Sequence, residues 1–292
     1  MRLSSLHSTV IQRRFNTKVS QSRKTGNGTP IISLLTDFGL VDPFVAEMKA
    51  VILSICPQAR IVDISHEVAE FDVRMGALIL AEASRSFPEG TIHIAVVDPG
   101  VGSSRRAIVV KTKRSTYLGP DNGLLIPSAT MDGIIGVFEI SNRSMMLREV
   151  SRTFHGRDIF APAAAHIACG HLPEECGANV NDYAPSPFRN PVLGDKSTTC
   201  EVLHIDRFGN LVTNLTPTHL RQWGIRLGQE VTLSTGGRKF RVNLVRTFSD
   251  IYGNRVGLMS GSHGFLEIAC RESKAVNRLR VRRGSVLRVS GY

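Results

Sequence analysis

IISLLTDFG at residues 31–39 sets the pattern for the first two-thirds of this chain: a short apolar run that ends in a turn rich in Asp and Gly. An apolar run of this length is typical of a buried strand. The pattern returns in AVVDPGVGSSRR (95–106), YLGPDNG (117–123), TFHGRD (153–158) and IDRFGN (205–210). Ligands of open α/β sheets bind at the carboxyl ends of the strands, so we expect these turns to line one crevice.

Strands and helices alternate in the prediction for the segment that begins at Ile31. In order, we expect a strand at 31–36, a helix from Asp42 (N-cap) and Pro43 (first position) to Ile55, a strand at 61–65, a helix starting at Asp72, and a strand at 91–98. This alternation indicates βαβ units and a parallel sheet. Further strands are expected at 106–112 and just before Tyr117, and a helix at 159–168 with Asp158 as its N-cap.

The last third changes character after a Pro-rich stretch at 182–198, which has the composition of a linker. Short strands joined by tight turns follow, as in an all-β sandwich or barrel of about 90 residues. We therefore expect an α/β N-terminal domain with a mainly parallel sheet and an all-β, barrel-like C-terminal domain. The predicted divisions are a basic N-terminal segment at 1–30, the α/β domain at 31–194 and the barrel at 195–292.

The net charge of +11 is concentrated in part at the N-terminus. Residues 1–30 hold six Lys and Arg and no Asp or Glu, which leaves +5 on the rest, an ordinary value. We therefore expect no nucleic-acid partner. The segment is interpreted as a mitochondrial or plastid transit peptide, or else as a disordered tail of a cytoplasmic protein. No apolar stretch approaches the roughly 20 residues that span a bilayer, so no membrane association is expected.

Five scattered cysteines, none in a CxxC pair, argue against a disulfide scaffold or a structural zinc site. The chain also lacks an HExxH metal motif, a Walker A loop and a GxGxxG loop. These absences exclude ATPases and dinucleotide enzymes of the usual kind. We expect no metal and no cofactor.

Two carboxylates stand at predicted strand ends. Asp37 either accepts the hydroxyls of a ribose or forms a turn with its own backbone. Asp98 is followed by two glycines and, seven residues on, by Arg105. A loop this short brings the guanidinium back to the carboxylate, either to hold a small nucleophile or as a plain salt bridge that pins the turn.

The third candidate is His155, which directly precedes the helix predicted at 159–168. Backbone N–H groups of the first turn favour an anion there, so His155 is interpreted as an acid/base or orienting group, or as an ordinary loop histidine. Asp121 belongs to a tight-turn sequence and is expected to be structural.

The candidate ligand-binding residues in the predicted barrel also have structural interpretations. Asp206 and Asn210 can bind an ammonium group and a base edge, or simply form a hairpin turn. Phe248 and Tyr252 can stack on a purine or pack the barrel, and Ser262 and His263 lie in the loop before GFLEIA.

Taken in order, the motifs resemble those of the S-adenosyl-L-methionine (SAM) hydroxide adenosyltransferase family, the adenosine-forming SAM hydrolases, which are related to SAM-dependent fluorinases and chlorinases. The resemblance spans about residues 31–290 and rests on TDFG, EMK, DISHEV, VVDPGVGSSRR, GPDNG, TFHGRDIFAPAAA, IDRFGNLVTN and GSHGFLEIA.

The resemblance implies a homotrimer with active sites at subunit interfaces, and hydrolysis of SAM to adenosine and methionine by attack of a water-derived nucleophile on C5′. By motif position, it makes Asp98, Arg105 and His155 catalytic. It implies that the substrate is bound by Asp37, Phe71, Asp206, Asn210 and the loop with Ser262 and His263. We add Phe248 to the predicted substrate-binding residues, because its ring can stack on the purine.

The sequence departs from the halide-using relatives, which carry Tyr at the position of Asp98 and Ser at that of Gly156. A carboxylate repels a halide by at least about 1 kcal/mol at 4 Å, so we expect water rather than chloride as the nucleophile. Ala275-Val276-Asn277 also departs from the family's more usual pattern. The alternatives are a metal-dependent phosphoesterase or nucleotidase that uses Asp37, Asp98, Asp121 and His155 as ligands, and a binding protein without turnover. Such a protein would bind SAM or a nucleoside, or would be a basic nucleic-acid binder.

Overall fold

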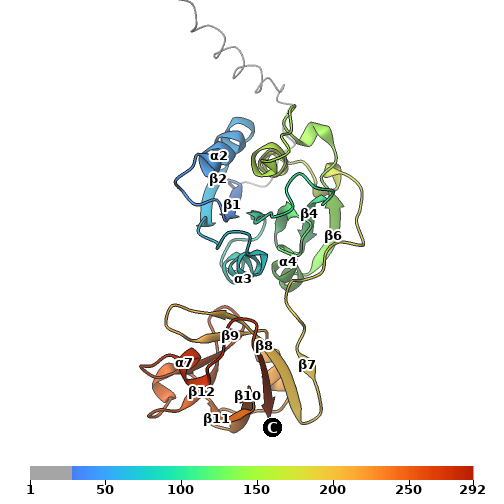
Figure 1. The fold of residues 1–292 in the computed structure, drawn as a ribbon. Coiled ribbons are helices and arrows are strands. Elements are labelled where there is room, and N and C mark those ends of the chain that lie inside the picture. Colours follow the sequence, from blue (N-terminus) through green and yellow to red (C-terminus); the bar gives the residue numbers. More distant parts are fainter. Residues whose placement is uncertain (1–27, 292) are drawn as a thin grey trace, which may run out of the picture. The chain divides into compact units, whose positions relative to one another are not determined.

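A computed structural model of the chain describes residues 28–291 (Figure 1). The basic segment interpreted as a transit peptide lies outside the described residues up to residue 27. The fold consists of two compact units that divide between Pro187 and Phe188. Between residues 28 and 291, no helix is both long and apolar enough to cross a bilayer.

The N-terminal unit is built on a six-stranded sheet in the order β2-β1-β3-β5-β4-β6. β1, β2, β3 and β5 pair in parallel, whereas β4 and β6 are antiparallel. The prediction of a mainly parallel sheet is therefore confirmed. The strands are β1 (Ile31–Thr36), β2 (Arg60–Ser65), β3 (Ile92–Val96), β4 (Ala107–Thr112), β5 (Thr116–Pro120) and β6 (Ile134–Glu139).

Helices cover both faces of this sheet because its central strands are apolar on both sides. β3 is buried along its whole length. On one face, α2 and α5 pack against Leu34 and Ile94. On the other, α3 approaches so closely that a Cβ on Gly76 would lie 3.0 Å from Val97. The helices are α2 (Phe44–Ile55), α3 (Val73–Ser84), α4 (Ile126–Asp132) and α5 (Ala161–Ala168), with short helical turns η1 (Arg143–Met145), η2 (Gly156–Phe160) and η3 (Pro173–Cys176).

Two predicted helix caps are wrong. Pro43 adopts helical backbone angles itself, so α2 begins at Phe44 and no described side chain, Asp42 included, caps it. Asp158 lies inside η2, a π-helical turn, where its carboxylate binds other partners, and α5 begins only at Ala161. The cap of α3 is as predicted, since Asp72 accepts a hydrogen bond from the N–H of Met75.

The C-terminal unit is a closed β-barrel, as predicted. Its strands follow the order β14-β10-β11-β12-β13-β9-β8-β7, and β14 also pairs with β8, which closes the ring. The interior is filled by alternate side chains such as Leu233, Val242 and Leu287. Its elements are β7 (Val192–Leu193), β8 (Ser197–Ile205), β9 (Leu211–Thr213), α6 (Pro217–Gln222), β10 (Glu230–Thr235), β11 (Arg238–Leu244), η4 (Phe248–Asp250), β12 (Val256–Ser260), β13 (Leu266–Cys270), α7 (Ala275–Leu279) and β14 (Val286–Ser290).

Replacing Asp72 by Ala is expected to lower the free energy of unfolding by about 1 kcal/mol, because α3 loses its cap. Asp42→Ala is the matched control and should stay within about 0.5 kcal/mol, since Asp42 caps no helix. Urea unfolding followed by far-UV circular dichroism measures both. Fluorescence of Trp223, the only tryptophan, reports the C-terminal unit separately. Equal losses in the two variants would contradict the capping role.

Candidate active site

A pocket of about 280 Å³ opens at the carboxyl edge of the parallel sheet, and Asp37, Phe71, Asp98 and His155 are among the residues that line it. The sheet register brings the two carboxylates together. β1 and β3 are neighbours with Thr36 opposite Val96, so Asp37 and Asp98 leave the sheet side by side. The pKa of Asp37 is raised, mainly by burial and in smaller part by the charge of Asp98.

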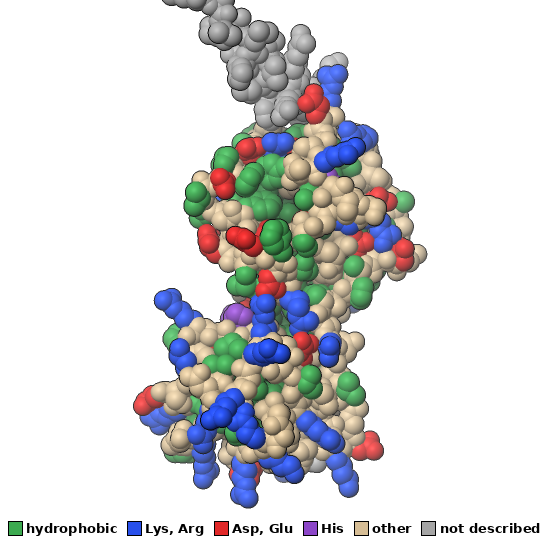
Figure 2. Space-filling model, viewed as in Figure 1, with side chains coloured by type: hydrophobic (Ala, Val, Ile, Leu, Met, Phe, Trp, Pro, Cys, Tyr) green, Lys and Arg blue, Asp and Glu red, His purple; other side chains and the backbone are tan. Residues whose placement is uncertain are grey.

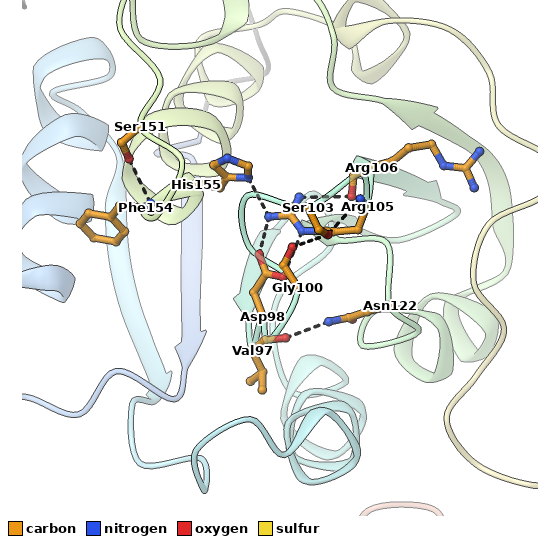
Figure 3. A network of polar contacts seen from close by, with 10 residues as sticks. All are labelled: Val97, Asp98, Gly100, Ser103, Arg105, Arg106, Asn122, Ser151, Phe154 and His155. Atoms are coloured by element: carbon orange, nitrogen blue, oxygen red, sulfur yellow. Dashed lines mark hydrogen bonds and ion pairs between the residues drawn. The ribbon is translucent and has the colours of Figure 1, made fainter.

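Asp98 and Arg105 form a two-pronged ion pair, seen in Figure 3. Nε of Arg105 donates to Oδ1 of Asp98 at 3.0 Å, and Nη2 donates to Oδ2. The two side chains are nearly buried, with 5% of Asp98 and 10% of Arg105 exposed. The contact predicted from the seven-residue spacing is therefore present. The two hydrogen bonds from one guanidinium fix the orientation of the carboxylate.

Arg105 also reaches His155, since Nη2 lies 2.8 Å from Nδ1 of the imidazole (Figure 3). A guanidinium only donates, so Nδ1 must accept, and the neutral ring carries its proton on Nε2. The pKa of His155 is lowered, first by partial burial and then by the charge of Arg105. The imidazole is therefore neutral near pH 7, with an N–H to donate.

A chain of charged groups supports the segment that carries His155. Asp158, 1% exposed, accepts a hydrogen bond from the N–H of Ser151 at 2.8 Å and pairs with Arg157 at 2.7 Å. Arg157 in turn pairs with Glu47 on α2 at 2.6 Å. Asp158 thus ties the loop before His155 to the helical turn after it. Its charge also raises the pKa of His155, against the larger lowering effects.

The turn after Asp98 and the loop before His155 meet through main-chain atoms. Gly102 has a φ of +76°, and a Cβ there would lie 2.3 Å from the carbonyl oxygen of Arg152. Only glycine fits such an approach. The separation between the carboxylate and the imidazole is therefore set by the backbone as well as by Arg105.

Phe71 stands at the rim of the pocket in a strained conformation. Its φ of +61° is rare for a bulky residue, and its side chain is 67% exposed. The N–H of Phe71 donates to Oδ2 of Asp37 at 2.9 Å. Strained residues of this kind gather at ligand-binding sites. The geometry thus links two residues that sequence analysis named separately.

In the C-terminal unit, Asp206 and Asn210 belong to one turn between β8 and β9. Oδ1 of Asp206 accepts hydrogen bonds from the N–H groups of Phe208 and Asn210, at 2.9 and 2.8 Å. Oδ2 accepts from the side-chain amide of Asn210 at 2.9 Å. The carboxylate is thus part of the turn and at the same time orients Asn210.

Asn210 and Phe248 line a second hollow, of about 530 Å³, together with Phe208. Phe208 is 75% exposed and Phe248 is 46% exposed, so two aromatic side chains lie open beside a buried amide. This combination suits a flat heterocycle with polar edges. Tyr252 lies instead at a different hollow, with Asn243 and Arg255.

Ser262 and His263 are exposed in the turn between β12 and β13. The pKa of Glu267 is raised, first by burial and then by the charge of Asp206, while His263 acts in the opposite direction. Asp206, His263 and Glu267 therefore form one charged group. In the C-terminal unit, Asp206 thus links the turn with Asn210 to His263, whereas Tyr252 lies apart from them.

Asp121, which a metal-dependent mechanism would need beside Asp98, is engaged elsewhere. It pairs with Arg106 at 2.8 Å and accepts a hydrogen bond from the N–H of Ala184 at 2.7 Å. In the same turn, the amide of Asn122 donates to the carbonyl of Val97 at 2.9 Å, directly before Asp98 (Figure 3). The structural interpretation of this turn is confirmed. Within residues 28–291, no three His, Cys, Asp or Glu side chains converge as a metal-ligand set.

Family models match both units in chain order. A model described as the SAM hydroxide adenosyltransferase N-terminal domain matches residues 32–177, and the corresponding C-terminal domain model matches residues 200–288. The chain belongs to the SAM hydroxide adenosyltransferase family. The resemblance drawn from the eight motifs is therefore confirmed.

Members of this family with curated names are similar over most of the chain. A protein of Salinispora arenicola named (R)-S-adenosyl-L-methionine hydrolase is 36% identical, with 90% of this chain and 98% of that protein covered. A fluorinase of Actinoplanes sp. is 31% identical, with 83% and 91% covered. Among solved structures, an uncharacterized conserved protein from Thermotoga maritima has a TM-score of 0.81 and 38% identity, with 89% and 100% covered.

Sequence analysis of this family member missed three residues of the two clusters. Arg157 was overlooked because its ion-pair partner, Asp158, was predicted to be a helix cap. Phe208 lies in the quoted motif IDRFGN, and an aromatic beside a turn glycine was the signal for it. Glu267 sits in a strand, where alternation alone does not reveal a half-buried carboxylate.

Nitrogen NMR of the histidine side chains tests the imidazole state. We expect His155 at pH 7 to be neutral with its proton on Nε2, and to titrate below the ordinary value of about 6.5. Loss of the resonance in His155→Gln assigns it. A proton on Nδ1, or a midpoint above 6.5, would contradict the contact with Arg105.

Proposed function

We propose that this protein hydrolyses SAM to adenosine and L-methionine, by attack of a water-derived nucleophile on C5′ of the ribose. The observation that carries the proposal is the cluster of Asp98, Arg105 and His155 beside Asp37 at one pocket. Its setting in a family whose curated relatives include SAM hydrolases supports the same chemistry.

The reaction needs a positioned nucleophile more than an acid. The sulfonium of SAM leaves as neutral methionine thioether and takes the electron pair of the C5′–S bond. A water oxygen forms the new bond to C5′, and one water proton is released. Holding the water in line with the C5′–S bond can contribute roughly 7–11 kcal/mol in favourable cases.

Asp98 is the group that accepts the hydrogen bond or proton of that water. Each carboxylate oxygen receives one hydrogen bond from Arg105 and keeps further acceptor capacity. Arg105 packs over the ring of the fully buried Phe160, at 5.5 Å, and so holds the carboxylate from the protein side. The neutral imidazole of His155 lines the same pocket and orients the water.

Water suits this pocket better than a halide. The charge of Asp98 disfavours an anion where the nucleophile must lie. Gly156 adds a steric argument, because a Cβ there would lie 3.1 Å from Sδ of Met48 and 3.2 Å from the ring of Phe154. A serine at this position, as in the halide-using relatives, would require its neighbours to shift.

Substrate contacts follow from the remaining candidates. Asp37 accepts the ribose hydroxyls and Phe71 covers the sugar. In the C-terminal unit, Asn210 reads the adenine edge between Phe208 and Phe248. Asp206 and the turn with Ser262 and His263 bind the ammonium and carboxylate of the methionine part. No cofactor takes part in this scheme.

The functional assembly in this proposal is a homotrimer with active sites at subunit interfaces. Exposed apolar side chains at and near the N-terminal pocket support it: Val41 is 100% exposed, Leu40 66% and Phe44 40%. Large exposed apolar groups of this kind mark surfaces that partners cover.

Incubating the purified protein with SAM and identifying the products tests the activity. We expect adenosine and methionine, in equal amounts, with chelator present and without dependence on chloride. A requirement for a divalent metal favours the phosphoesterase alternative, tight SAM binding without products favours a binding protein, and a chlorinated nucleoside favours halide transfer.

Asp98→Asn is expected to lower kcat by roughly 100-fold or more with little change in KM, because the variant keeps its shape and loses its charge. Asp121→Asn is the matched control, since Asp121 also pairs with an arginine but lies outside the cluster. It should leave kcat within about twofold. Equal loss in both variants would argue that only folding is affected.

A further inference from the structure

The charge of the chain is divided unequally between its two units. Residues 31–187 hold 13 Lys and Arg against 18 Asp and Glu, a net charge of −5. Residues 188–292 hold 17 Lys and Arg against 7 Asp and Glu, a net charge of +10. The ordinary value of +5 outside the N-terminal segment is therefore an average over an acidic unit and a strongly basic barrel.

Internal ion pairs cannot neutralise this excess. With 7 acidic residues in the unit, one-to-one pairing leaves at least 10 of its 17 basic side chains without a carboxylate. The pairs that form on the surface are loose, as between Arg241 and Glu230 at 3.6 Å. Exposed pairs of this kind contribute little. The barrel thus carries a positive field that attracts anions from outside the unit.

The strand register places part of this charge on one face. Inward residues of β10, β11 and β14 fill the barrel, so their alternate neighbours point outward. Ser234 on β10 lies opposite Lys239 on β11 and, on its other side, opposite Arg288 on β14. Two residues along β11, Arg241 lies opposite Thr232. We name the basic face after its three exposed cations, Lys239, Arg241 and Arg288.

A second group of arginines lies at the edge of the basic face. Nη2 of Arg238, the first residue of β11, donates to the carbonyl oxygen of Leu279 at 2.7 Å. This bond ties the β10–β11 hairpin to the end of α7, where Arg278 in the last turn and Arg280 and Arg282 just after the helix are exposed. Figure 2 shows Lys and Arg side chains gathered on the visible surface of the C-terminal unit.

The chemistry of the face indicates its partner. Arginine supplies 14 of the 17 cations of the unit, and its fork matches phosphate oxygens. Hydroxyl groups of Thr232, Ser234 and Ser290 stand between the cations. Guanidinium, ammonium and hydroxyl donors are those that contact a nucleic-acid backbone. A membrane surface would favour bulky apolar anchors among the cations, whereas the outward neighbours of Arg288 along β14 are Val286 and Ser290.

We propose that the basic face binds the phosphate backbone of nucleic acid, without sequence preference. This function is separate from SAM hydrolysis, because the basic face contains none of the residues assigned to the substrate. It replaces the expectation of no nucleic-acid partner, which rested on the average charge.

Binding of the full-length protein to a short fluorescent single-stranded RNA of mixed sequence, followed by anisotropy between 50 and 200 mM salt, tests the proposal. The triple variant Lys239→Gln/Arg241→Gln/Arg288→Gln should bind more weakly. Its slope of log affinity against log salt should be shallower by about 2, since each phosphate contact contributes roughly 0.7. Hydrolysis of SAM should be unchanged in this variant.

The matched control removes three exposed cations from the N-terminal unit, as Arg60→Gln/Lys113→Gln/Arg148→Gln. It has the same net charge as the first variant and the same N-terminal segment, and it should keep the slope of the unaltered protein. Equal loss in the two variants, or no RNA binding at 50 mM salt, overturns the proposal. So does preferential binding to vesicles of anionic lipid over RNA.

Discussion

One guanidinium organises the N-terminal site. Arg105 bonds to both oxygens of Asp98 and to the imidazole of His155, so the orientation of the carboxylate and the tautomer of the ring depend on the same group. Three pieces of chain must meet for this: the end of β3, the turn that follows it, and the loop before η2. The parallel sheet supplies the first, and the contact between Gly102 and Arg152 joins the other two.

Local signals in the sequence predict much of the N-terminal unit and part of its site. Buried runs predicted the strands, the spacing of Asp98 and Arg105 predicted their contact, and the shared strand-end turns predicted one crevice. That Asp37 and Asp98 lie on neighbouring strands became clear only in the structure. The turn that carries His155 was expected in the same crevice, but the contact of His155 with Arg105, 50 residues away, has no local signal, and the grouping of the two residues followed only from the family resemblance. The prediction that Asp42 caps a helix was wrong because Pro43 itself takes helical backbone angles. The prediction for Asp158 was wrong because its carboxylate forms an ion pair with Arg157.

The barrel was predicted in outline, but its net charge was hidden in the average over the whole chain. Its short strands with alternating apolar residues were predicted from the sequence as a sandwich or barrel, and the pairing of β14 with β8 shows the closed barrel. The charge of the barrel can also be counted from the sequence, but it was summed with that of an acidic unit, so half of it was cancelled. The turn at Asp206 shows a different limit: one carboxylate both shapes the hairpin and orients Asn210, so a structural and a ligand-binding role do not exclude each other.

The π-helical turn η2 carries one residue more than a regular α-helix needs for the same rise. Each residue of an α-helix turns the chain by about 100°. Deletion of a single codon within 156–160 would therefore produce an ordinary helix, yet it would swing His155 away from Arg105. The number of residues in this turn is therefore as constrained as the identities of Gly156, Asp158 and Phe160 within it.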